Sequence, residues 1–212
     1  MKNVKMFVVA LALLGFAACS STKNAIIPLT DKAEVEDTYT LIWNGVSQAY
    51  RYTDTGWLRA PNYDYVFDVV QKRYHNQWKS TKSLHRLHTG YDGRAGARDQ
   101  TMYFELAFNA FNDGKVVADI KSSLGDGTGS CDAEFREQQL VMYVKDAGMF
   151  MPYNKVRITQ HYNYEEGLLT ETVELLKEDK GHDTPFMKNE ERAYIYTKSK
   201  LTGAPTTYVA GK

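Results

Sequence analysis

QTMYFELAFNAFNDGKVVADIKSSL, residues 100–124, alternates apolar and polar side chains along most of its length. Phe104, Leu106 and Phe108 share one face if this segment is extended, because successive side chains of a strand point to opposite sides. The Asn-Asp-Gly sequence at Asn112–Gly114 is typical of a tight turn between two strands. The stretch therefore predicts an antiparallel hairpin with one apolar face.

The same period of two continues toward the C-terminus in shorter segments, which are separated by glycine-containing or charged turns. The segments that carry it are 116–124, 131–135, 140–144, 156–162, 169–176 and 192–200. Short strands joined by short turns are typical of an antiparallel sheet. We expect about seven strands in this part of the chain.

Residues 37–52 are compatible with two structures. Leu41, Ile42 and Val46 recur at helical spacing, whereas the alternation of Leu41 with Trp43 would suit a strand. We favour the helix here.

Residues 62–79 predict a helix more clearly. Tyr63, Val66, Phe67 and Val70 follow the i, i+3, i+4, i+7 spacing of a buried helix face. The segment also begins with an asparagine, which is a good N-cap residue. We expect this helix to cover the apolar face of the sheet.

The first 18 residues have the layout of a secretory signal peptide. Lys2 and Lys5 form a positive end, and residues 6–16 form an apolar run that is too short to span a bilayer as a helix. The next residues, Phe16-Ala17-Ala18-Cys19, resemble the lipobox of bacterial lipoproteins, although that family usually has Leu or another aliphatic residue at the position of Phe16. The resemblance implies cleavage before Cys19 and the attachment of acyl chains such as palmitate to Cys19.

A lipidated Cys19 would make the membrane the first partner of this chain and would place the protein in the cell envelope. Because Ser20 follows the cysteine, the resemblance implies the outer membrane, facing the periplasm, in a Gram-negative host. The alternative is a plain signal peptide that is cut near Ala18 and leaves Cys19 unmodified.

The predicted fold class is α+β, with two N-terminal helices packed on a curved, mainly antiparallel sheet or incomplete barrel of about seven strands. Residues 1–18 are assigned to the signal peptide and residues 19–36 to the lipidated N-terminus and tether. Residues 37–201 form a single domain, and residues 202–212 form a loose C-terminal tail.

The charge of the chain is balanced, with 26 basic and 26 acidic residues. Removing residues 1–18 takes away two lysines and leaves 194 residues with a net charge of −2. This balance argues against a nucleic-acid binder, which needs a strongly basic face. Cys131 is the only cysteine besides Cys19, so we expect no intramolecular disulfide once Cys19 carries lipid.

Ten aromatic residues lie between Tyr39 and Trp78. They could line a pocket for an apolar or sugar-like ligand, because aromatic rings offer flat contact area at low entropic cost. They could equally fix the helices on the sheet. The candidate ligand-binding residues are Trp43, Trp57, Tyr63, Phe67, Tyr74 and Trp78.

Residues 72–98 contain seven basic residues and one acidic residue. They could form a surface patch for anionic lipid head groups or another anionic ligand. They could also be solvated, or pair with the acidic stretch 165–191. The candidate residues for the patch are Lys72, Arg73, Lys79, Lys82 and Arg86.

We expect no catalytic residue, no metal and no cofactor. His85 and His88 could share a helix face, but nothing in the sequence places a third zinc ligand beside them. The stretch 126–137 resembles a calcium loop only loosely, because Cys131 stands where the loop needs glycine. The chain also lacks a Gly-x-Ser-x-Gly nucleophile motif.

The leading hypothesis is a non-enzymatic envelope lipoprotein that binds an apolar or anionic ligand, or a protein partner, in a groove between helices and sheet. The alternative is an envelope hydrolase that acts on a cell-wall or lipid substrate. A third hypothesis is a structural or assembly partner without a ligand.

Overall fold

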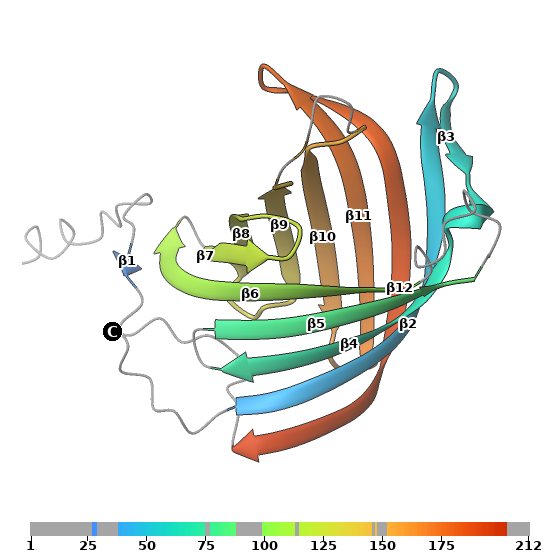
Figure 1. Ribbon diagram of the computed structural model, residues 1–212. Helices are drawn as coiled ribbons and strands as arrows, with labels where there is room; N and C mark the ends of the chain where they lie inside the picture. Colours follow the sequence, from blue (N-terminus) through green and yellow to red (C-terminus); the bar gives the residue numbers. More distant parts are fainter. Residues whose placement is uncertain are drawn as a thin grey trace, which may run out of the picture.

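A closed antiparallel barrel of ten strands is the architecture of this protein (Figure 1). The computed structural model describes residues 27–28, 38–74, 77–87, 99–112, 115–145, 147 and 152–202. Across these residues the chain is all-β, and the single helical element is the three-residue 3-10 helix η1 (Pro61–Tyr63).

The ten barrel strands follow one another around the ring in chain order. They are β2 (Thr38–Thr53), β4 (Tyr65–Tyr74), β5 (Gln77–Arg86), β6 (Asp99–Asn112), β7 (Lys115–Ser122), β8 (Gly127–Asp132), β9 (Glu137–Tyr143), β10 (Lys155–Asn163), β11 (Leu168–Asp179) and β12 (His182–Thr202). Each strand pairs with the next one, and β12 pairs with β2 to close the ring. In Figure 1 the strands β6, β5, β4 and β2 form a front wall that crosses β9, β10 and β11 behind it.

Two short strands lie outside the ring. The strand β1 (Ile27–Pro28) pairs with the end of β6, and β3 (Gly56–Arg59) pairs with the end of β2. The β2–β3 hairpin extends beyond the barrel wall, as the cyan arrow on the right of Figure 1 shows. Residues 27–28 are the only part of the predicted tether that the structure describes.

The core lies inside the barrel and consists of two clusters of buried side chains. The first surrounds Trp78 and draws residues from β5 to β10, while the second surrounds Trp43 and draws residues from β2, β4, β5, β10, β11 and β12. The predicted hairpin face is confirmed, since Leu106 and Phe108 are buried in the first cluster. The predicted turn at Asn112–Gly114 lies partly outside the described residues.

The predicted α+β fold is wrong. Where the structure describes residues 37–52 and 62–79, which we expected to be helices, they form β2, the end of η1, β4 and the start of β5. The sheet is a closed barrel rather than an incomplete one. Ten strands enclose the interior, where we had expected about seven strands covered by helices.

The helical pattern of residues 62–79 arose from mixing two faces of a strand. Phe67 is buried inside the barrel, whereas Val70 is exposed on the outer surface. Gln71 and Arg73 point inward and are buried, so the inner face of β4 does not read as continuously apolar. Because polar residues point into the barrel, apolar and polar residues do not alternate regularly along β4, and strand prediction depends on that alternation.

Candidate functional site

A belt of polar side chains runs across the inner wall of the barrel. Cross-strand pairing places Gln138 beside Gln160, Gln160 beside Glu171, and Glu171 beside Glu191. The row continues on the next three strands, from Glu191 to Ser47, Tyr65 and Arg86. We call these seven residues, which lie on seven consecutive strands from β9 to β5, the polar belt.

Lys82 on β5 contacts the belt from the front wall. Its Nζ lies 2.7 Å from Oε1 of Glu171 and 2.5 Å from Oε2 of Glu191. The remaining carboxylate oxygens also accept hydrogen bonds, because Gln160 donates to Glu171 and the Tyr65 hydroxyl donates to Glu191. All three charged side chains are almost completely buried. We call Lys82, Glu171 and Glu191 the buried triad.

Burial and mutual attraction together set the ionisation of the buried triad. Burial raises the pKa of Glu191, and repulsion from Glu171 raises this pKa further. Attraction to Lys82 lowers the pKa of Glu191 but does not outweigh these two effects, so the pKa is raised to about 7. Burial alone would raise the pKa of Glu171 and lower that of Lys82. The attraction between these two groups prevails, so the pKa of Glu171 is lowered and that of Lys82 is raised.

A cavity of about 170 Å³ lies beside the belt inside the barrel. Five of the belt residues and Lys82 line it together with apolar side chains, some of them on the same strands as the belt. The apolar lining includes Phe104, Leu106, Leu140, Val156, Ile158 and Val173. The cavity is therefore amphipathic, because belt residues and further polar side chains, such as Gln71, Ser80 and Asn189, share its lining with apolar residues.

Gln138 differs from the rest of the belt. It is only 3% exposed and lines the cavity, and its Nε2 makes no hydrogen bond within the described part of the chain. A buried amide donor without an acceptor is costly, so this atom marks a position where the cavity offers a hydrogen bond to an occupant.

A cluster that we call the aromatic plug consists of Arg73, Trp78, Phe135, Tyr162 and Tyr164. The guanidinium carbon of Arg73 lies 3.8 Å from the ring centroid of Trp78 and 4.9 Å from that of Tyr162. Arg73 donates a hydrogen bond of 2.7 Å to the Tyr164 hydroxyl, and this hydroxyl donates one of 2.7 Å to the Phe135 carbonyl. The Phe135 ring packs on Trp78 with centroids 5.1 Å apart.

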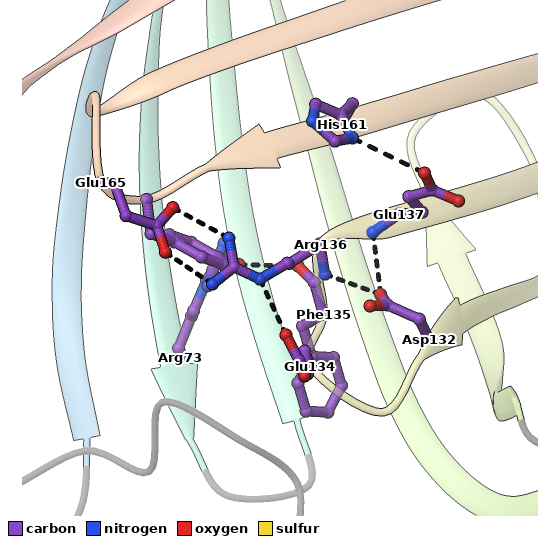
Figure 2. Close-up of polar contacts among 9 residues, drawn as sticks. Arg73, Asp132, Glu134, Phe135, Arg136, Glu137, His161 and Glu165 are labelled. Atoms are coloured by element: carbon purple, nitrogen blue, oxygen red, sulfur yellow. Dashed lines mark hydrogen bonds and ion pairs between the residues drawn. The ribbon is translucent and has the colours of Figure 1, made fainter.

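Polar contacts hold the β8–β9 loop in place over the plug (Figure 2). Arg136 forms two parallel hydrogen bonds, of 2.7 and 2.9 Å, with the Glu165 carboxylate on the β10–β11 loop. Asp132 accepts hydrogen bonds from the backbone amides of Arg136 and Glu137. Phe135 has a φ of 55° here, so the loop keeps a bulky residue in the left-handed region in order to point its ring inward.

The predicted aromatic candidates do not form one pocket. Trp43 and Phe67 belong to the Trp43 cluster, and of the five candidates whose side chains the structure describes, only Trp78 lines the cavity. Trp57 lies on β3 against Tyr52, outside the ring. Tyr63 lies in η1, where the Arg86 guanidinium carbon is 5.8 Å from its ring centroid. The side chain of Tyr74 and the whole of Cys19 lie outside the described residues.

The candidate basic patch is divided between the two surfaces of the barrel wall. Arg73, Lys82 and Arg86 point into the barrel, while Lys72 and Lys79 line a shallow groove on the outside. This division follows from the strand geometry, because residues of opposite parity on one strand face opposite sides.

The site residues that the sequence analysis did not name as candidates are Ser47, Tyr65, Gln138, Gln160, Glu171 and Glu191. Their signal was a polar residue at an inward position of a period-two strand, as at Glu171 between Leu169 and Val173. We expected the acidic stretch 165–191 either to be solvated or to pair with residues 72–98. Glu171 and Glu191 do pair with Lys82 of that segment, inside the barrel.

No known protein family matches this chain, and no curated protein matches it significantly. In the described part of the chain, no group of three or more His, Cys, Asp or Glu residues is arranged to hold a metal ion. The same residues include no helix that could cross a membrane.

Proposed function

We propose that this chain is an envelope lipoprotein, anchored through Cys19, whose barrel holds a small, largely apolar ligand without catalysis. The observation that carries the proposal is the amphipathic cavity inside the barrel, which is lined by residues of the polar belt and by apolar side chains. The cavity volume of about 170 Å³ suits a ligand about the size of a single aromatic ring or a short alkyl chain.

The state of the buried triad favours binding over catalysis. The four carboxylate oxygens of Glu171 and Glu191 already accept hydrogen bonds from Lys82, Gln160 and Tyr65. A general acid or base must reach a reacting group with its own oxygen, and these oxygens are committed to protein donors. The triad instead ties the front wall of the barrel to the back wall.

The cavity is tested by filling it. Val173 lines it, so Val173→Phe should exclude a ligand, whereas Thr172→Phe, on the neighbouring residue that does not line the cavity, should not. Wild-type protein purified from its native host should release a small organic compound, detectable by mass spectrometry after solvent extraction. Val173→Phe should release much less than Thr172→Phe, provided that far-UV circular dichroism shows both to be folded. Equal amounts from the two variants would contradict the proposal.

The anchor is tested separately at the N-terminus. Mass spectrometry of the processed chain should show a Cys19 residue that carries acyl chains. Cys19→Ala should move the protein from the membrane fraction to the soluble fraction, because two or more acyl chains supply the stable anchoring. An unmodified Cys19 at the mature N-terminus would refute the anchor and leave the cavity proposal standing.

A further inference from the structure

Gln138 indicates the chemistry of the ligand, if the barrel interior is the binding site proposed above. Its Nε2 is buried, lines the cavity and makes no hydrogen bond within the residues that the structure describes. The group that satisfies this donor must carry an acceptor oxygen. Leu140 on the same strand and Ile158 on the next strand line the cavity nearby and offer apolar contact to the rest of the same molecule.

The charge of the site argues against an ionic ligand group at this position. Lys82 is already shared between Glu171 and Glu191, so the buried triad has no positive charge left for an anion. With both carboxylates ionised, the triad carries a net charge of −1. Glu171 lies two strands from Gln138, roughly 10 Å away, where a unit charge at the effective dielectric of a protein interior would weaken binding of an anion about tenfold.

A cationic group fits no better. An ammonium group has only donors and leaves Nε2 of Gln138 unsatisfied. It would also have to be stripped of water in a largely apolar cavity, while both carboxylates of the triad remain bound to Lys82. Arg86 is the remaining cationic group on the cavity wall, and it lies on β5, far around the ring from Gln138 on β9.

We propose that the ligand is a neutral amphiphile whose hydroxyl, ester or amide oxygen accepts a hydrogen bond from Gln138, while its short apolar body lies against Leu140, Ile158 and Val173. This proposal rests on the proposed function and names the class of molecule for the same site. The polar belt then contacts the neutral head group. The net negative charge of the buried triad disfavours an anion, and the cost of removing water from an ammonium group disfavours a cation.

Three eight-carbon compounds that differ in head group separate the possibilities: octanol, octanoate and octylamine. Isothermal titration calorimetry at pH 8 with the full chain carrying Cys19→Ala avoids competition from attached lipid. We expect octanol to bind at least about tenfold more tightly than either ion. Gln138→Leu should weaken octanol binding by about three- to tenfold, the effect of one hydrogen bond.

The matched control is Gln139→Leu, which makes the same exchange on the exposed neighbour of Gln138. Its affinity for octanol should equal that of the parent protein. Tighter binding of octanoate, or an equal loss of octanol affinity in both glutamine variants, would overturn the neutral-ligand proposal and leave the ligand-binding barrel intact. Failure of all three compounds to bind the parent protein would overturn both proposals.

Discussion

Lys82 is the residue on which the order of the barrel interior most depends, because its ammonium group bridges carboxylates that lie 89 and 109 residues away in the chain. Three buried charges are expensive unless each is paired and hydrogen-bonded. Here Lys82 supplies the countercharge, while Tyr65 and Gln160 satisfy the outer carboxylate oxygens. The residue therefore acts as a tie between two walls of the barrel.

Removal of Lys82 should be strongly destabilising. Lys82→Met leaves two adjacent carboxylates buried without a cation, and we expect the free energy of unfolding to fall by about 3–5 kcal/mol. The control is Lys79→Met, which removes a lysine on the outer surface whose ion pair with Glu105 is 3.7 Å long, and it should cost less than about 1 kcal/mol. Urea denaturation measures both. Equal effects of the two substitutions would show that the triad is not a structural tie.

Glu191 should make stability depend on pH. Burial raises its pKa from 4.5 to about 7, so between these values the folded state holds a proton that the unfolded state has released. The contribution of this group is therefore fully present below pH 4.5 and is lost as pH rises through about 7, with a size of the order of 3 kcal/mol. The glutamine in Glu191→Gln cannot titrate, so the stability of this variant should not fall in this way as the pH rises.

The measurement is the free energy of unfolding from pH 4 to pH 9 for wild type and Glu191→Gln. The stability of wild type relative to the variant should decline between about pH 4.5 and 7 and level off above that range. Glu171 titrates in both proteins, so its opposite contribution at lower pH largely cancels in the comparison. A difference that stays constant with pH would rule out the proton on Glu191.

At the scale of single elements, the β8–β9 loop contributes an aromatic side chain to the interior. It carries Phe135 inward onto Trp78 and Phe108, with ring centroids about 5 Å from each. The sequence analysis placed this residue in a strand, because Cys131, Ala133 and Phe135 alternate with polar residues. The structure ends β8 at Asp132, whose carboxylate accepts hydrogen bonds from the backbone amides of Arg136 and Glu137 across the turn.

Shortening Phe135 should test both the plug and the backbone that carries it. Phe135→Ala should reduce the free energy of unfolding by about 3–5 kcal/mol, because it empties a buried aromatic site. Phe135→Gly should be about 1 kcal/mol less destabilising than Phe135→Ala, since glycine adopts the observed φ of 55° without steric cost. Thermal unfolding with Glu134→Ala as an exposed control measures the series. A glycine variant less stable than the alanine variant would contradict the argument from φ.

At the scale of the whole molecule, the ring of ten strands joins two core clusters into one interior. The Trp43 and Trp78 clusters meet at Tyr162, whose ring centroid lies 5.8 Å from that of Trp43 and 6.3 Å from that of Trp78. The polar belt and the buried triad also draw on both halves of the ring. Opening the ring at any seam would expose two unpaired strand edges.

We therefore expect the two clusters to unfold together. Two variants report on them, because the chain has three tryptophans and Trp57 lies outside the ring: Trp57→Phe with Trp78→Phe leaves Trp43, and Trp57→Phe with Trp43→Phe leaves Trp78. In each variant the urea midpoint from fluorescence should equal the midpoint from far-UV circular dichroism of the same protein. Separate midpoints in either variant would show that its cluster unfolds independently.

The sequence by itself indicated most strands after residue 100, because alternation along a pleated strand needs no information from distant residues. It did not place their ends, since β8 stops at Asp132 and β12 begins at His182. It left β2, β4 and β5 unrecognised, since inward polar residues such as Gln71 and Lys82 break that alternation. Only the tertiary structure decided that these polar groups belong inside, because their partners arrive from strands about one hundred residues away and are in place only when the ring is closed.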